Sequence, residues 1–341
     1  SVTVFHERAR TYIQLFEDGK TNYIRVNSQL VSGVSLAWAN KMDNFVFMSL
    51  PGRKTFREVV MMDSNDDDPM GIRLIMQLIH FKYLELPDRL SIAELYSVAR
   101  VAYKHSCTTL LAPFAERWIL NGLQWEVKSD TTGANHDKVF VLAWLLGEAR
   151  AFAKVFTEVV DTMTINPLTK IPLDRDGNSW LEQPLSSRLI SVMRAARLNR
   201  LQDMMNALDR PVTQLLEAPT SYTFCRANDA DEFKVACQAQ QLGSLMSGLV
   251  AAQFMPFPAV EDYYDSVNSM AARIADIKVN RFKIPGVLPH NDAHVKCGVK
   301  HKEAIKAIKE QPIKLQRTLA AELRFNGMKS GAFRDENFVE L

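Results

Sequence analysis

The stretch from Val59 to Trp118 places the strongest constraint on the fold, because it carries three consecutive helix patterns separated by turn signals. The first pattern follows an acidic, turn-forming run at Asp63–Pro69 and repeats apolar residues at i, i+3, i+4 and i+7. Acidic residues near the start of a helix are favourable for its dipole, so this run predicts a helix start. Leu86 precedes Pro87, which disfavours helical geometry at the residue before it and separates this helix from the next.

The second and third patterns continue the helical run. Ser91 is placed as an N-cap, and Glu94 follows three residues later, which is the spacing of a capping box. Leu110, Phe114 and Trp118 then recur at i, i+4 and i+8, the spacing of one helical face. The stretch therefore predicts three amphipathic helices on one core.

Upstream of this run, the sequence favours strands. Residues 12–26 alternate apolar and polar side chains around Asp18–Lys20, which predicts two strands joined by a tight turn. Residues 30–42 repeat an apolar side chain at every fourth position and predict one helix. Phe45–Met48 is a short apolar run, and Phe56–Met62 is a further strand candidate. The order predicts a mixed α+β domain that ends in the helical run.

A set of residues in this order resembles a known family. The family's motif comprises an acidic loop, a helix that ends in an hF-Y-ELP turn, an LS-EL helix start and a KY-CT-L-PWAERW segment, and a set of residues in this chain matches it. The matching residues are Asp66, Asp67, Pro69, Leu78, His80, Phe81, Tyr83, Leu86, Pro87, Leu90, Ser91, Glu94, Leu95, Lys104, Cys107, Thr108, Leu111, Pro113, Ala115, Glu116, Arg117 and Trp118. On these residues the chain resembles the BTB/POZ domain of the type found in many filamentous-fungal proteins.

The resemblance implies an α+β fold with an N-terminal BTB/POZ domain, a small sheet with helices, over residues 1–122. A mostly α-helical C-terminal region follows over residues 138–341. Residues 123–137 lose periodicity and gain Ser, Thr, Gly and Asn, so we interpret them as a linker or long loop. Members of the family commonly form homodimers through the N-terminal strand and first helices. The resemblance therefore implies a non-enzymatic module for protein–protein interaction and self-association, a scaffold or a transcription- or chromatin-type regulator with an unidentified protein partner.

Many BTB/POZ proteins instead recruit a cullin-type ubiquitin ligase, and those members carry a hydrophobic-x-Glu signature. The segment that we match to this signature, Asp43–Thr55, contains no glutamate. A cullin-dependent substrate adaptor, with the C-terminal half holding the substrate, is therefore the alternative and not the preferred interpretation.

Four residues in the C-terminal half have the chemistry of a zinc site. Cys225 and Cys237 flank a polar loop, and His294 and Cys297 form a His-x-x-Cys pair. Structural zinc takes four tetrahedral ligands of the Cys and His type, and these residues supply three sulfurs and one nitrogen. His290, four residues before His294, is an alternative nitrogen ligand. The pattern predicts one structural zinc ion, and ordinary unliganded side chains are the other interpretation.

The rest of the C-terminal half is dominated by helix patterns. Residues 139–160 and 185–208 are apolar at helical spacing, and an irregular insert at 168–184 separates them. Four arginines recur along the second helix, and we expect them on a solvated face, with contact to phosphate or nucleic acid as the alternative. They are Arg188, Arg194, Arg197 and Arg200.

The last part of the chain is basic. Residues 278–341 contain 13 Lys and Arg against 7 Asp and Glu, with lysines along a helix pattern that Pro312 interrupts. Such a tail has the charge to contact nucleic-acid phosphates. Aromatic side chains for base stacking are sparse in it, so we favour a solvated amphipathic helix.

The net charge and the number of cysteines limit the partners and cellular compartments that we expect. A net charge of +2 over 341 residues gives no whole-chain field that favours nucleic acid or a membrane. Four cysteines in a chain of this length are no disulfide scaffold, and Cys107, in an apolar stretch, is expected in the core. The sequence shows no charged-then-apolar leader and no run of 18 apolar residues. We expect an intracellular protein, in the nucleus or cytoplasm, with no membrane span.

Catalytic motifs find little support in the sequence. It contains no Gly-x-Ser-x-Gly, no Gly-rich phosphate loop with Lys and Ser/Thr, and no His-Glu-x-x-His. Asp262 and Asp265 form an acid pair, but we favour a role for them as caps of a helix over residues 266–277. An enzyme with its site in the helical half is therefore the least favoured alternative.

Overall fold

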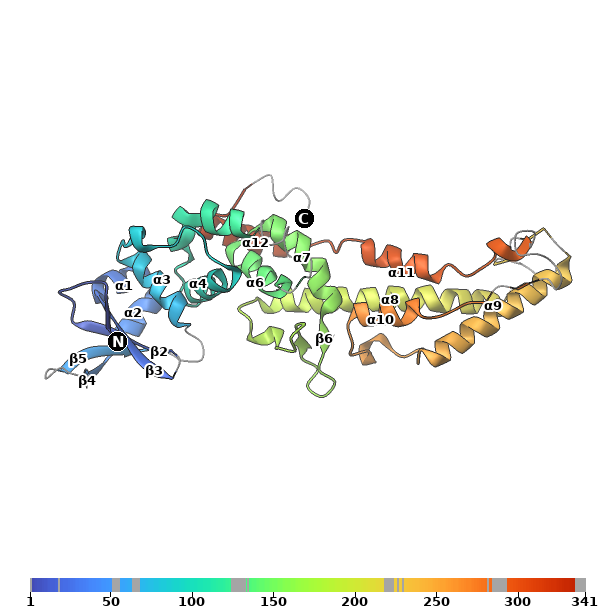
Figure 1. Cartoon of the computed structure of the whole chain (residues 1–341), viewed down its shortest axis with the longest axis horizontal. Coiled ribbons are helices and arrows are strands. Elements are labelled where there is room, and N and C mark those ends of the chain that lie inside the picture. Colours follow the sequence, from blue (N-terminus) through green and yellow to red (C-terminus); the bar gives the residue numbers. More distant parts are fainter. Residues whose placement is uncertain are drawn as a thin grey trace. The chain divides into compact units, whose positions relative to one another are not determined.

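The fold is described by a computed structural model (Figure 1). The structure describes residues 2–17, 19–50, 56–62, 68–123, 133, 135–217, 224–225, 227–228, 230–280, 282–283 and 293–334. They form a mixed α+β chain in which a small N-terminal sheet is followed by helices. The α+β class and the mostly helical C-terminal part are confirmed at this level.

Contacts divide the chain into two compact units, each built from separated segments. Unit 1 comprises Ser1–Val159, Leu181–Ser187 and Lys314–Leu341, and unit 2 comprises Val160–Trp180 and Arg188–Ile313. Unit 1 thus includes the C-terminal end of the chain as well as the sheet. The predicted boundary of a BTB/POZ domain at residue 122 concerns the family resemblance and stays a prediction, and most of the predicted linker lies outside the described residues.

Five strands in the described part of unit 1 form a sheet with the order β1-β3-β2-β5-β4. They are β1 (Val2–Val4), β2 (Thr11–Glu17), β3 (Lys20–Val26), β4 (Val46–Ser49) and β5 (Phe56–Met61). The predicted hairpin is confirmed, with β2 and β3 antiparallel from Thr11 opposite Val26 to Glu17 opposite Lys20. β2 and β5 are parallel, β1 pairs in parallel with β3, and β4 pairs antiparallel with β5. Because β2 is central, its first five residues are buried.

The single helix predicted between the hairpin and β4 is wrong. The chain forms two helices, α1 (Ser28–Val34) and α2 (Leu36–Asp43). Ser35 between them is extended, and its hydroxyl accepts a hydrogen bond from the Trp38 N–H at 3.1 Å. The same hydroxyl donates to the His105 carbonyl oxygen at 2.6 Å. A serine that caps the second helix therefore interrupts an apolar pattern that runs through both.

The next two helices begin where the sequence predicts. α3 (Pro69–Ile79) is capped by Asp68, whose carboxylate accepts from two backbone N–H groups of the first turn. α4 (Ile92–Lys104) starts with the predicted capping box, in which Ser91 and Glu94 bond each other's backbone. The two helices pack against each other.

The turn between α3 and α4 contains the short 3₁₀ helix η1 (Tyr83–Glu85) and is held by side chains from farther along the chain. Trp118 donates its indole N–H to the Pro87 carbonyl oxygen at 3.1 Å. Arg117 pairs with Asp88 at 3.1 Å. The two motifs that carry much of the family resemblance are thus in direct contact.

The third predicted helix is not α-helical along its length. The chain forms a 3₁₀ segment, η2 (Thr108–Phe114), and then a π-helical segment, η3 (Ala115–Leu120). Because these turns differ in pitch from an α-helix, the predicted stripe shifts. Leu111 is buried in place of Leu110, whereas Trp118 is buried as predicted.

The apolar pattern over residues 139–160 is continuous in the sequence, but the chain forms two helices there. They are α6 (His136–Leu146) and α7 (Ala149–Thr162). Gly147 ends α6 in the left-handed conformation, at φ 68°. This conformation is open to glycine but costly for other residues, so it marks the helix end.

The C-terminal helix, α12 (Arg317–Ser330), packs on α6 within unit 1. Asn326 donates to the Trp144 carbonyl oxygen at 2.9 Å, and Ser330 donates to the Leu146 carbonyl oxygen at 2.5 Å. α12 thereby satisfies carbonyl groups at the C-terminal end of α6 that have no partner within the helix.

Unit 2 is mainly helical. From α7 onward the chain forms β6 (Thr164–Ile165), β7 (Pro172–Leu173), η4 (Trp180–Glu182), α8 (Ser187–Glu217), α9 (Asp231–Ala251), η5 (Val260–Asp262), α10 (Val267–Ala275), η6 (Ala293–Lys296) and α11 (His301–Glu310). Apolar side chains from α8, α9, α10 and α11 share one core. Among them are Leu201, Met204, Leu208, Leu245, Leu249, Met270, Ile274 and Ile305. The predicted break at Pro312 is confirmed, because α11 ends before it and α12 begins after it.

The solvated face predicted for four arginines on α8 is half wrong. Arg188 and Arg194 are exposed, but Arg197 and Arg200 are buried. Arg197 donates to the backbone carbonyl oxygens of Tyr263 and Asp265, both at 2.6 Å. Buried cations persist where such acceptors are available, so this guanidinium fastens the segment before α10 to α8.

Arg200 completes this buried polar region of unit 2. It pairs with Asp161 at 3.3 Å and donates to the Ile308 carbonyl oxygen at 3.0 Å. Burial lowers the pKa of Arg197 to about 10, which still leaves that side chain charged near neutral pH. Both arginines therefore serve tertiary structure and are not available to phosphate.

The acid pair at residues 262 and 265 does not cap α10 as predicted. Ser266 is the N-cap, and its hydroxyl accepts from the Ser269 N–H at 3.0 Å. None of the helices in the described ranges is both long enough and apolar enough to cross a membrane.

Candidate metal centre

Four potential ligands come together in unit 2 from three separate segments. Cys225 lies between α8 and α9, Cys237 lies within α9, and His294 and Cys297 lie in and directly after η6. The sequence placed Cys237 at the end of a loop, which is wrong because α9 begins at Asp231. The helix α9 therefore supplies one ligand, the segment before it supplies a second, and η6 with the residue after it supplies the other two.

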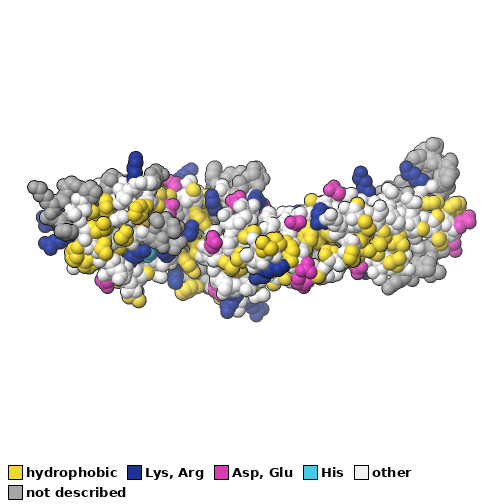
Figure 2. All heavy atoms as spheres, turned by 90° about the horizontal axis from the view of Figure 1, so that it is seen from below, with side chains coloured by type: hydrophobic (Ala, Val, Ile, Leu, Met, Phe, Trp, Pro, Cys, Tyr) yellow, Lys and Arg dark blue, Asp and Glu magenta, His cyan; other side chains and the backbone are white. Residues whose placement is uncertain are grey.

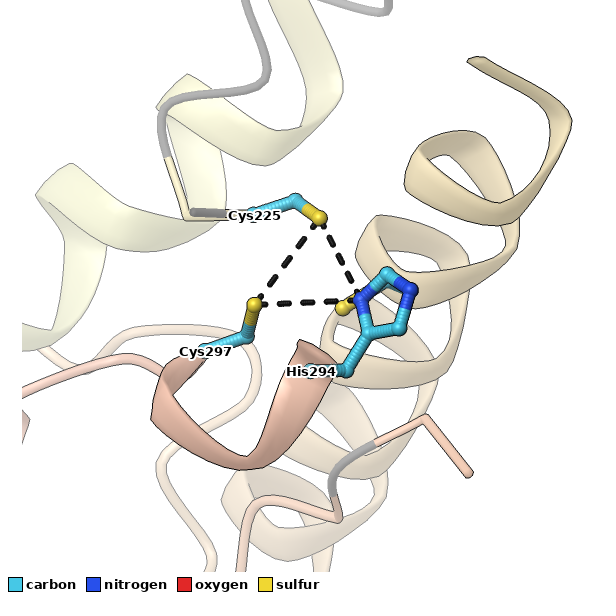
Figure 3. Close-up of side chains that lie close together, drawn as sticks. Cys225, His294 and Cys297 are labelled. Carbon is cyan, nitrogen blue, oxygen red and sulfur yellow. Dashed lines mark hydrogen bonds between the residues drawn. The ribbon is translucent and has the colours of Figure 1, made fainter. Parts of the chain in front are cut away.

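The separations between the donor atoms fit a tetrahedral ion. The Cys225 and Cys297 sulfurs are 3.8 Å apart, and His294 Nδ1 lies 3.4 Å from the first sulfur and 3.8 Å from the second (Figure 3). One ligand atom from each of these residues and from Cys237 lies within 4.8 Å of every other. With bonds of about 2.3 Å to sulfur and about 2.05 Å to nitrogen, a tetrahedral zinc separates two sulfurs by about 3.8 Å and sulfur from nitrogen by about 3.6 Å.

The cluster is closed to solvent. All four ligand residues are buried, with His294 and Cys237 at 0% exposure. The Phe282 ring packs edge-on against the His294 ring, with centroids 5.3 Å apart. Among the described residues, the small Ala227 is buried together with the ligands. The cluster is therefore shielded from water.

Burial makes the thiols poor acids when no cation balances them. The loss of solvation raises the pKa of Cys237 to about 12, and the pKa of Cys225 is raised for the same reason. The neighbouring sulfurs repel a second thiolate and add to both shifts. A divalent cation reverses this balance, because thiolates coordinate it and their protons leave on binding.

Gln241 is a site residue that the sequence patterns missed. It is fully buried, and its amide Nε2 donates to the Cys237 sulfur at 3.2 Å. An N–H donor favours the thiolate form and orients it, which is how neighbouring groups support metal ligands. The spacing in the sequence is compatible with this contact, because Gln241 follows Cys237 by four residues and therefore lies on the same face of α9.

The other candidates from the sequence are placed as follows. His290, the alternative nitrogen ligand, lies outside the described residues. Cys107 is fully buried in unit 1, as predicted, and burial raises its pKa to about 11. The buried group of Cys225, Cys237, His294 and Cys297 can therefore bind a metal ion.

Comparison of the chain with protein-family models, with curated proteins and with solved structures finds no match.

Proposed function

We propose that this protein is a non-enzymatic interaction module of the BTB/POZ type, which self-associates through unit 1 and carries one structural zinc ion in unit 2. The coarse order of elements supports the family assignment, because a small N-terminal sheet is followed by helices, as the resemblance implies. A scaffold or a transcription- or chromatin-type regulator, in the nucleus or cytoplasm, is the role that fits such a module.

The observation that carries self-association is the exposure of apolar side chains on β1 and at the start of α2. All three residues of β1 are exposed at one edge of the sheet, including Val2 and Val4. Leu36, at the start of α2, is 77% exposed. An exposed apolar edge strand is a ready template for pairing, and large exposed apolar side chains mark interfaces. These are the elements through which the family commonly forms dimers.

Light scattering after size exclusion tests this proposal. We expect wild-type protein to elute as a dimer, and Leu36→Glu combined with Val4→Lys to shift it to monomer, because each change places a charge in an apolar interface. Leu168→Glu is the matched control, since Leu168 is 91% exposed in unit 2. A monomeric wild type at all concentrations, or a dimer that survives the double change, contradicts the proposal.

Cullin binding is the alternative within the same class. Titration of a purified cullin N-terminal region into the wild-type protein separates the two, and we expect no binding in the micromolar range. Nanomolar binding promotes the substrate-adaptor function over the preferred one. An enzyme with its site in the helical half is the remaining alternative and needs a substrate turned over by unit 2.

Zinc is the ion that best fits the four ligands. Three thiolates and one imidazole form a soft, closed set that fills a tetrahedron, which is typical of structural zinc and leaves no position for a substrate. Two of the ligands, Cys225 and His294, are 69 residues apart in the sequence. An ion held by both joins the segment before α9 to η6 and restrains a long stretch of chain.

Elemental analysis of protein purified without chelator tests the zinc proposal. We expect about one zinc per chain, and we expect Cys237→Ser to lower the zinc content. Cys107→Ser is the control, because Cys107 is equally buried but lies in unit 1 away from the cluster. Protein that folds and holds no metal, or equal loss in both variants, overturns the assignment.

A further inference from the structure

A surface groove runs between α10 and α11 in unit 2, and neither self-association nor zinc explains it. Its volume is about 560 Å³. One face of each helix lines it, at i, i+3, i+4 and i+7 in both cases. The lining residues are Asn268, Ala271, Ala272 and Ala275 from α10, and Lys302, Ile305, Lys306 and Lys309, with Glu310, from α11.

The two walls of the groove differ in chemistry. The α10 wall consists of small side chains, of which Ala272 and Ala275 are exposed. The α11 wall carries three exposed lysines, with the buried Ile305 below them. A neighbouring helix axis can approach closely where side chains are small, so the α10 wall suits a packed helix.

The charges on the α11 wall remain only partly balanced. Lys302 donates to the Ala275 carbonyl oxygen at 2.5 Å, which fixes that ammonium at the C-terminal end of α10. Lys306 lies 3.7 Å from Glu310, and both side chains are well exposed. Three lysines against one glutamate leave the wall positive. On the face shown in Figure 2, side chains of Lys and Arg are mixed with those of Asp and Glu.

We propose that this groove docks an acidic amphipathic helix of a partner protein. Lys302, Lys306 and Lys309 recur at i, i+4 and i+7, so carboxylates at the same spacing on a partner helix face all three in register. The apolar side of that helix packs on the alanine wall, as in other helix-in-groove complexes. The site lies in unit 2 and is independent of self-association through unit 1 and of the zinc ion.

Nucleic acid fits the groove less well than a helix does. Sequence-tolerant single-strand binders combine basic grooves with aromatic side chains on which bases stack. Every described residue that lines this groove is non-aromatic, and Ala271, Ala272, Ala275 and Ile305 give it apolar lining. One wall of the groove has small apolar side chains and the other has basic side chains. An amphipathic helix, with one apolar and one charged face, is complementary to both walls.

Fluorescence anisotropy with the full chain tests this proposal. The probe is a labelled 18-residue helical peptide with Glu at i, i+4 and i+7 on one face and Ala and Leu beside it. We expect micromolar binding that weakens as salt rises, since exposed ion pairs contribute. Lys306→Glu with Lys309→Glu reverses two charges, and Ala272→Trp fills the groove without changing charge. Each is expected to weaken binding by at least about tenfold.

The controls separate docking from charge alone. Lys20→Glu with Lys329→Glu changes the net charge equally at exposed positions in unit 1 and is expected to leave binding unchanged. Lys306→Gln with Lys309→Gln is a second, milder variant in case the charge-reversed protein misfolds. We expect it to give an intermediate loss of peptide binding. Circular dichroism verifies that each variant stays folded.

Three outcomes overturn the docking proposal. One is no binding of the peptide by the full chain at 0.1 mM, taken as roughly the weak limit of specific association. Another is peptide binding that Ala272→Trp leaves intact, which assigns the contact to lysines alone. The last is an oligonucleotide of equal charge that competes as well as the peptide, which assigns the surface to phosphate.

Discussion

Unit 1 and the metal cluster of unit 2 differ in what holds their chains together. Unit 1 buries large apolar side chains, with Trp38, Trp118, Trp144 and Phe152 all almost fully enclosed. The cluster gathers Cys225, Cys237 and Cys297 around a histidine, with Phe282 only partly buried at its side. Among the described residues named here, the thiols of the cluster thus bury less apolar surface per side chain than the aromatic rings of unit 1.

This difference has a direct energetic meaning. Burying a large apolar side chain contributes about 1.5–3 kcal/mol, so an aromatic core holds separate segments together unaided. Small thiols contribute far less, and ordering the segments around them costs conformational entropy at every residue. We therefore expect unit 1 to fold without metal and the cluster segments to require it.

Metal removal is the most severe test of that contrast. When a zinc-selective chelator is added, we expect amide hydrogen exchange to rise sharply in η6 and in the first half of α9, because apparent zinc binding of roughly 10 kcal/mol or more is lost. Exchange in α3 and α4 of unit 1 should stay unchanged. Equal protection in both places with and without chelator would show that the cluster is stable on its own.

Gly147→Ala tests the other region of the comparison, the packing of unit 1. Gly147 has φ 68°, and a Cβ there would lie 1.9 Å from the Gly327 nitrogen of α12. The left-handed conformation costs about 1–2 kcal/mol for alanine, and forced displacement of α12 adds roughly 1–3 kcal/mol. We expect unit 1 to lose about 2–5 kcal/mol of unfolding free energy in urea titrations, with unchanged zinc content.

Gly19→Ala is the matched control for that substitution. Gly19 has φ 71° in the same unit, but nothing lies within 4 Å of the Cβ it would gain. Only the conformational cost, about 1–2 kcal/mol, then applies. Equal losses for the two variants would mean that α12 yields freely and does not clamp α6.

Gln241→Leu tests how much a neighbouring hydrogen bond contributes to metal binding, without removing a ligand. The change deletes the N–H donor 3.2 Å from the Cys237 sulfur and keeps a similar volume. Loss of such supporting hydrogen bonds typically lowers metal affinity about 10–100-fold. Competition with a calibrated chelator measures this, and Gln202→Leu on the exposed face of α8 is the control. Unchanged affinity would reduce Gln241 to a packing residue.

Local signals were read correctly from the sequence. The capping box at Ser91, the hairpin and the break at Pro312 each depend on residues a few positions apart, and each formed as predicted. The ligand types of the metal cluster were also found, because Cys and His are rare and their chemistry is specific.

Features that depend on distant partners were not predictable in this way. Ser35 ends a helix pattern while its hydroxyl bonds His105, 70 residues away. Arg197 looks like a surface residue until the segment before α10 brings it carbonyl acceptors. The position of Cys237 within α9 followed from where that helix begins, which no cap residue marks. Tertiary structure determined each of these outcomes.

The smallest expected effect is the pH dependence that His80 gives to unit 1. His80 is buried, and its Nε2 accepts from the Asn27 N–H at 2.9 Å while Nδ1 lies 2.8 Å from the Met76 carbonyl oxygen. The ring is therefore neutral, with its proton on Nδ1. Burial lowers the pKa of His80 from its ordinary 6.5, and nearby His6 and Lys82 act in the same direction.

This shift determines how stability responds to acid. Well above pH 6.5 the His80 ring is neutral in the folded and the unfolded chain, so it contributes no pH dependence there. As pH falls below 6.5, the unfolded chain takes up a proton that the folded chain still excludes, and unit 1 loses stability until the lowered pKa is reached. Urea titrations from pH 7.5 to 5 should show this loss in wild type but not in His80→Gln, whose side-chain carbonyl still accepts from Asn27. Identical slopes in the two proteins would mean that protonation of His80 is not the source of the loss of stability.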